Sequence, residues 1–258
     1  MTQLAAHTVY LAGRQLLRLW RQPAFVALTL LQPLFWMLLF GQVFAAIAEL
    51  PAFAGDTYAT FLAPGIVVMS ALFAGMWNGM SSIDAIDRGI MNRFLITPAN
   101  RAALLLGPMA QIAVVTVING TVILGIAWWQ GAQFGSGPIG LLVLIVCAVL
   151  VGTGLGALSH AAALIVRREE SLIGVINLLA LPLSFLSPIF MQRDLMPEWV
   201  QRVVVFNPVS WAVDAGREAL AIDPSWGFVG IRVAALMVIV IVAAAIATQA
   251  FRAYQRSV

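Results

Sequence analysis

Six long apolar runs, each close to the length of a membrane-spanning helix, constrain this sequence more than any other feature. A helix needs about 20 mostly apolar residues to cross the hydrocarbon core of a bilayer. The composition agrees, because 62% of the residues are hydrophobic and only 10% are charged, far from the balance of a soluble domain. We therefore expect an all-α integral membrane protein with six transmembrane helices, and the 258 residues predict a single transmembrane domain, 1–258. The runs lie at about 24–48, 58–82, 103–129, 138–166, 171–190 and 227–250.

Two further segments are charged and amphipathic. In residues 6–21, Arg14, Arg18 and Arg21 follow helical spacing and share one face of a helix. This pattern favours an N-terminal helix lying in the membrane interface over a flank that only sets topology. Residues 191–226 mix charges with aromatic side chains and contain two prolines that suit helix starts. They favour short helices at the outer surface, an extracytoplasmic helical insert, over a solvated loop.

The arginines predict the orientation of the chain. All fourteen basic residues are arginine, and ten of them lie on the side that holds both termini. Cytoplasmic loops carry an excess of positive residues, so we expect a multi-pass protein with both termini in the cytoplasm. The absence of lysine, which genome composition alone can explain, still excludes a P-loop, because its lysine binds nucleotide phosphates. If the protein uses ATP, a separate subunit must bind the nucleotide.

The segment 82–101, SIDAIDRGIMNRFLITPANR, places five charged residues between the second and third apolar runs. A charged insert must lie in water, so we expect a short helical elbow on the cytoplasmic side. Gly89 can supply a turn, and Thr97 before Pro98 should end the helix. Such an elbow could transmit a movement of a soluble partner to the membrane-spanning helices. The alternative is an anchor that sets topology and has no partner.

Uncharged polar residues within the apolar runs are candidate functional residues, since polar groups are costly inside a membrane. No acid lies in the middle of a run, which counts against a proton-driven or sodium-driven transporter. Each amide or hydroxyl more often bonds a neighbouring helix, so both roles stay open. The six residues are Gln32, Asn78, Gln111, Thr116, Asn119 and Asn177.

Other residues predict helix packing rather than chemistry. The pairs Gly75 with Gly79 and Gly152 with Gly156 have the spacing that lets membrane helices approach closely. His160 follows a serine, but adjacent side chains diverge by about 100° on a helix, which favours a packing role over a hydrolase site. One cysteine and two widely separated histidines predict no metal site.

Two motifs resemble those of type-2 ATP-binding-cassette (ABC) exporter permeases. Residues 87–98, DRGIMNRFLITP, are similar to the family's cytoplasmic motif, and residues 207–217, NPVSWAVDAGR, are similar to its motif before the last span. The plan of the chain is similar over nearly its whole length. The similarity is greatest to daunorubicin-resistance-type drug export permeases, and nodulation-type lipo-oligosaccharide export permeases share the plan. The chain departs from the pattern at Asn92, where the family often has a glutamate.

The resemblance implies roles for individual residues. The elbow would couple the protein to an ATPase, and the second span would face a partner protomer. Trp77 beside Asn78 on that span is then the first candidate for the substrate path, together with Asn177. The implied coupling residues are Asp87, Arg88, Arg93, Phe94, Thr97 and Arg101. The residues of the outer motif are Asn207, Pro208, Asp214 and Arg217.

The function implied by the resemblance is that of a membrane-spanning permease subunit of an ATP-driven ABC exporter. It would move an amphipathic drug-like or lipid-linked substrate out of the cytoplasm, across the bacterial inner membrane. The subunit would be no enzyme and hold no cofactor, because ATP and Mg²⁺ would bind the ATPase. The expected partners are two copies of that ABC ATPase subunit, a second permease protomer in a homodimer, and membrane lipid, with no nucleic acid.

Two alternatives stay open at this stage. One is an ATP-independent membrane scaffold or assembly factor that binds a soluble cytoplasmic partner. The other, less favoured, is a lipid-acting intramembrane enzyme.

Overall fold

The computed structural model describes residues 23–44, 57–89 and 101–256, and this part of the chain is helical and contains no strand. The predicted interfacial helix at 6–21 lies outside the described residues. The prediction of an all-α membrane protein is confirmed. The helices are α2 (Pro23–Val43), α3 (Tyr58–Asn78), α4 (Met80–Asp87), α6 (Arg101–Trp129), α7 (Gly137–Val166), α8 (Glu169–Phe185), the 3-10 helix η3 (Arg193–Leu195), α9 (Glu198–Val204), α10 (Pro208–Leu220) and α11 (Trp226–Arg256).

Each of the six predicted apolar runs contains a helix. Within the described residues, four helical segments are long and apolar enough to cross a membrane. The apolar part of α2, Thr29–Val43, is shorter, and α8 has 17 residues, so a crossing by these two helices stays a prediction. The four segments are Tyr58–Asp87, Gly107–Trp129, Gly137–Val166 and Trp226–Arg256.

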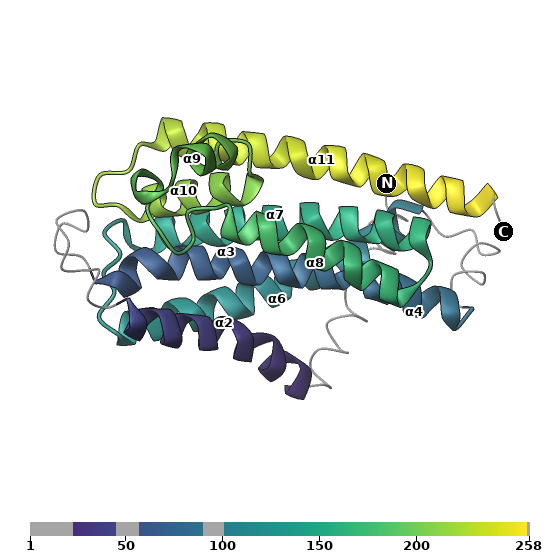
Figure 1. Cartoon of the computed structure of the whole chain (residues 1–258), viewed down its shortest axis with the longest axis horizontal. Coiled ribbons are helices and arrows are strands. Elements are labelled where there is room, and N and C mark those ends of the chain that lie inside the picture. Colours follow the sequence, from purple (N-terminus) through teal and green to yellow (C-terminus); the bar gives the residue numbers. More distant parts are fainter. Residues whose placement is uncertain (1–22, 45–56, 90–100, 257–258) are drawn as a thin grey trace.

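The helices form a bundle with α3 and α7 at its centre (Figure 1). In the most apolar window of α3 and α4, 78% of the residues are buried, compared with 17% in α11, which covers the outside. α7 packs between α3 and α11, and α6 and α2 pack against α3. The short helices α9 and α10 lie at one end of the bundle, and the ends of α4, α7 and α11 lie at the other, beside the start of α8.

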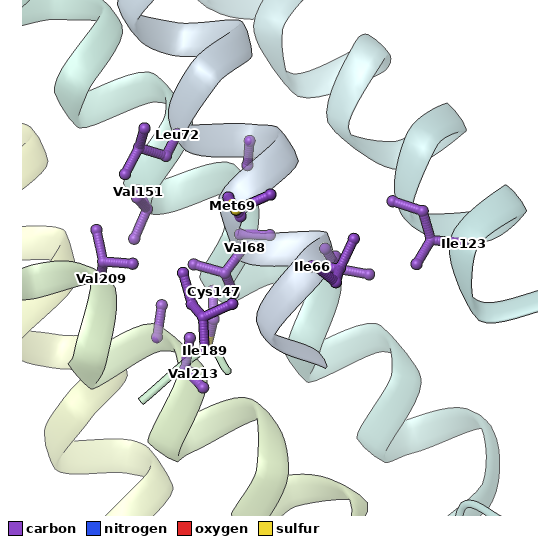
Figure 2. Packing of buried hydrophobic residues seen from close by; sticks show 14 of the residues in the cluster. Ile66, Val68, Met69, Leu72, Ile123, Cys147, Val151, Ile189, Val209 and Val213 are labelled. Atoms are coloured by element: carbon purple, nitrogen blue, oxygen red, sulfur yellow. The ribbon is translucent and has the colours of Figure 1, made fainter. Parts of the chain in front are cut away.

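The hydrophobic core lies where α3, α7 and α10 meet. Figure 2 shows Met69 and Leu72 of α3 close to Val151 of α7 and Val209 of α10, and all four side chains are buried. Lipid is as apolar as these side chains, so close packing rather than escape from water holds such helices together.

Small residues let α3 and α7 approach closely. A Cβ atom added to Gly75 would lie 2.1 Å from the carbonyl oxygen of Gly152. A Cβ atom added to Gly156 would lie 3.4 Å from the carbonyl oxygen of Gly75, and one added to Gly79 would clash with Ser159. The predicted packing role of both glycine pairs is confirmed.

α3 continues into α4 with only a local break at Gly79, so the apolar helix runs 30 residues, Tyr58–Asp87. Residues 82–87 of the predicted elbow form the last six of the eight residues of α4. The helix ends at Asp87, and the chain turns at Gly89, whose φ is +65° and whose N–H donates to the Ile86 carbonyl at 3.0 Å. Only glycine adopts this backbone readily, so the predicted turn at Gly89 is confirmed. Residues 90–100 lie outside the described part of the chain.

The start of α10 is fixed by a cap that also holds the end of α8. Pro208 is the first residue of α10, and Asn207 Oδ1 accepts a hydrogen bond from the Val209 N–H at 2.9 Å. Asn207 Nδ2 donates to the carbonyls of Leu183 at 2.8 Å and Leu186 at 2.7 Å. One amide therefore satisfies both a helix start and a helix end, and the predicted helix break at this position is confirmed.

Candidate functional site

A cavity of about 680 Å³ lies between α2, α3 and α6. It reaches α4 and Glu169, the first residue of α8, at the end of the bundle opposite α9 and α10. α2 lies along one side of the bundle at an angle, and its first turns lean away from α3 (Figure 1). The volume is that of a small-molecule site, which typically measures about 300–1,000 Å³.

The wall formed by α3 is mainly apolar and aromatic. Met69, Phe73 and Trp77 all line the cavity, and they are spaced four residues apart along the helix. Residues with this spacing share one face of a helix, so their side chains form a continuous strip along the cavity. Trp77 is 41% exposed, so the cavity presents an aromatic ring that can contact a bound molecule.

The wall formed by α6 is polar at both ends and apolar between them. Gln111, Val115 and Asn119 are also four residues apart and line the cavity together with Ile112. Gln32 of α2 adds a third amide. The structure thus gathers most of the polar residues that the sequence singles out inside the apolar runs.

Asn119 is the least usual of these residues. It is 1% exposed, and its Oδ1 atom has no hydrogen-bond partner in the described structure. A buried acceptor without a partner is costly, and such groups need an explanation. Thr116, one turn earlier, is also buried without a partner for its hydroxyl, but it does not line the cavity.

The predicted pair Trp77 and Asn78 does line the cavity, but Asn78 is also held by α7. His160 Nε2 lies 2.9 Å from Asn78 Oδ1, and its Nδ1 lies 2.7 Å from the Ser82 hydroxyl. Because an amide oxygen can only accept, Nε2 donates to Asn78, and in the neutral ring Nδ1 accepts from Ser82. His160 is 2% exposed and ties α3 and α4 to α7, which agrees with the predicted packing role.

Asn177 is not part of this cavity. It lies on α8 with its side chain exposed and does not line the cavity that Trp77 and Asn78 share. The structure therefore brings together two of the three residues that we predicted for a substrate path.

Three of the six predicted coupling residues lie in the described part of the chain. Asp87 ends α4, and Arg88 follows it and lies 3.5 Å from Asp84 in a pair whose side chains are both 69% exposed. Exposed pairs of this kind add about 0–1 kcal/mol, so Arg88 is not held rigidly. Arg101 begins α6. The remaining three, Arg93, Phe94 and Thr97, lie outside the described residues.

The outer motif forms a second polar cluster, around Arg217. Its guanidinium donates to the Phe61 carbonyl at 3.1 and 3.0 Å and to the Ile189 carbonyl at 3.1 Å. Asp214, one turn earlier on α10, pairs with Arg193 at 3.1 Å. Burial raises the pKa of the Asp214 carboxyl above its ordinary value, and the neighbouring arginines oppose this rise.

This cluster joins segments that are distant in the sequence, and its contacts are structural. Arg217 lies over the Phe61 ring, 3.6 Å from the ring centroid, and burial lowers the pKa of its guanidinium. The sequence motif identified Asp214 and Arg217 but not Arg193, because that ion pair forms only when η3 folds against α10. The spacing of residues near Arg193 does not predict its ion pair with Asp214.

Comparison with known proteins identifies the family. Residues 6–221 match the model of the ABC-2 type transporter family. The chain is 33% identical to the ycf38 transport permease of Cyanophora paradoxa, over 84% of this chain and 75% of that protein. It is 28% identical to the daunorubicin resistance ABC transporter permease DrrB1 of Streptomyces coeruleorubidus, over 74% of this chain and 66% of that protein. It is 25% identical to the linearmycin resistance permease LnrN of Bacillus subtilis, over 62% of this chain and 40% of that protein.

The family match covers most of the chain and includes both motifs described above. The daunorubicin-resistance relative is named as an ABC transporter permease, and permease subunits of ABC transporters are not catalytic. The chain belongs to the ABC-2 type transporter family of membrane permeases.

Proposed function

We propose that this chain is the membrane-spanning subunit of an ATP-driven exporter of an amphipathic drug-like or lipid-linked molecule. The observation that carries the proposal is the family match over residues 6–221. Two relatives are named for resistance to daunorubicin and to linearmycin, and removal of a toxic molecule from the cell is a direct way for a permease to give resistance.

The energy source in this proposal is a separate ATPase. The sequence contains no lysine and therefore no P-loop, so ATP and Mg²⁺ bind two copies of the ATPase partner. A second copy of the permease completes a homodimer in the bacterial inner membrane. Both termini face the cytoplasm. The described arginines at the end of the bundle where α4 and α11 finish support this orientation: Arg88, Arg167, Arg168, Arg252 and Arg256.

In this proposal the ATPase acts on the permease through the segment 82–101. Its first residues belong to α4, which continues the central helix α3, so a push on this segment acts on α3 directly. The glycine contacts and the His160 bridge bind α3 and α4 to α7. α3 and α7 therefore move together as one body. The movement changes their position relative to α2, at the boundary where the cavity lies. The residues that contact the ATPase in this scheme are Asp87, Arg88, Arg93, Phe94, Thr97 and Arg101.

The proposal is tested by purification under mild conditions. The tagged permease is extracted in a gentle detergent from its own host, and co-purifying proteins are identified and quantified. We expect an ATPase in equal amount, whose ATP hydrolysis rises when daunorubicin is added. A soluble partner without a nucleotide site, or no nucleotide-binding partner at all, would instead favour an ATP-independent scaffold.

A further inference from the structure

We infer that the cavity between α2, α3 and α6 binds the transported molecule, and that Asn119 selects cargo with a neutral hydrogen-bond donor on an apolar, ring-containing body. This inference rests on the proposed function and adds to it a chemical class of cargo and the side chain that recognises it.

The first observation is the unpaired acceptor. Four buried side-chain atoms in the described part of the chain lack a hydrogen-bond partner, and only Asn119 Oδ1 belongs to a residue that lines the cavity. An amide oxygen can accept but not donate, so the group that satisfies it must carry an O–H or N–H. A molecule that offers such a donor forms the hydrogen bond that the protein itself does not supply to Asn119 Oδ1.

The second observation is the spacing of polar groups along α6. Gln111 precedes Asn119 by eight residues, which corresponds to roughly 12 Å along a helix axis. Ile112 and Val115 line the stretch between them. An elongated molecule with a polar group at each end and an apolar middle matches this wall.

The opposite wall favours rings. Phe73 and Trp77 both line the cavity from α3, and aromatic faces bind flat apolar groups well. A rigid ring system also loses less conformational freedom on binding than a flexible chain does. The cavity therefore suits a ring-containing body more than a long acyl chain.

The charges explain why the donor is neutral. Among the described residues that line the cavity, Asp84 and Glu169 are the only ones with a formal charge. Both belong to the end formed by α4 and the start of α8, and Asp84 pairs with Arg88. The described residues of α6 that line the cavity beside Asn119 include no carboxylate that could neutralise a cation. A hydroxyl or amide N–H fits there better than an ammonium group.

A labelling experiment on the permease alone tests this inference. The single cysteine, Cys147, is fully buried, so Cys147→Ala provides a background without cysteine. Ala74→Cys then places one thiol in the cavity wall. The rate of maleimide labelling is measured in detergent, without ATPase or nucleotide. The probe is trans-stilbene with a para hydroxyl on each ring, and the comparison molecule carries methoxy groups in place of both hydroxyls.

We expect the dihydroxystilbene to slow labelling, and the dimethoxystilbene to require about tenfold more for the same protection, because it lacks donors. Asn119→Leu should raise the concentration of dihydroxystilbene for half-protection by about tenfold and leave that of dimethoxystilbene unchanged. Thr116→Val removes a similar unpaired polar atom outside the cavity and should change neither value. If Asn119→Leu does not fold, the comparison of the two stilbenes in the protein that carries only Cys147→Ala and Ala74→Cys still decides the question.

The inference is wrong if neither stilbene protects the thiol, if both protect equally, or if Asn119→Leu has no effect. These failures are separable from failure of the proposed function. Loss of selective protection with ATP-dependent transport intact would refute the site alone. Selective protection in a protein that recruits no ATPase would support the site and refute the exporter.

Discussion

Gly75 of α3 and Gly152 of α7 are so close that a Cβ atom on Gly75 would fall 2.1 Å from the Gly152 carbonyl oxygen. No rotation of a side chain can relieve such a contact, because the atom that it would meet is backbone. The two central helices can therefore approach in this way only with glycine at position 75. This interface joins α3, which leads into the elbow through α4, to α7, which carries His160.

Gly75→Ala should separate α3 from α7 and lower the free energy of unfolding by about 1–3 kcal/mol, the usual range for overpacking. The measurement is unfolding in mixed micelles with increasing sodium dodecyl sulfate. Gly125→Ala is the matched control, since a Cβ atom there meets nothing within 4 Å. It should leave stability unchanged or raise it by up to about 1 kcal/mol. Equal effects of the two substitutions would contradict the close helix contact.

His160→Ala should destabilise the protein by about 1–3 kcal/mol, because the partly buried polar groups of Asn78 and Ser82 lose their partner. The coupling can be measured by a double-mutant cycle with Asn78→Ala. We expect the two effects to be less than additive, since either substitution breaks the same hydrogen bond. Strict additivity would show that the two residues do not interact. Transport per folded molecule should persist in His160→Ala. Complete loss of transport in folded protein would instead favour an enzymatic role for His160.

Arg217→Met should lower the free energy of unfolding by about 1.5–3 kcal/mol, because the carbonyls of Phe61 and Ile189 lose a charged donor. Arg202→Met is the matched control. Its guanidinium is 3.9 Å from Glu198, and the two side chains are 82% and 91% exposed, so it should change stability little. Thermal unfolding of both variants measures the difference. Similar midpoints for Arg217→Met and the parent protein would argue against a structural role for the outer motif.

Much of the helical architecture could be predicted from the sequence, because hydropathy and helix-breaking residues act locally. The apolar runs locate the helices, and the Asn207–Pro208 pair locates the start of α10. The fifth apolar run predicts a helix to about residue 190, whereas α8 ends at Phe185. Pro188 lacks a backbone N–H and disfavours a helical residue before it, so the helix ends although the side chains remain apolar.

The functional site could be predicted only in part, because it depends on how the helices are turned toward one another. Hydropathy marks Gln111 and Asn119 as unusual, and their spacing predicts a shared face, but neither shows that α2 and α3 complete a cavity there. The hydrogen bond that His160 donates to Asn78 joins residues 82 positions apart. The same geometry gives Asn78 a structural partner that no local pattern indicates.

The most direct test of the central claim is ATP-dependent accumulation of daunorubicin in inside-out vesicles that contain the permease and its ATPase. We expect accumulation with the parent protein, and its loss with Arg93→Glu or Phe94→Asp while insertion into the membrane is unchanged. Arg256→Glu, on the same proposed side but outside the elbow, should retain transport. Full transport by both elbow variants, or accumulation that needs no ATP, would contradict coupling through the segment 82–101.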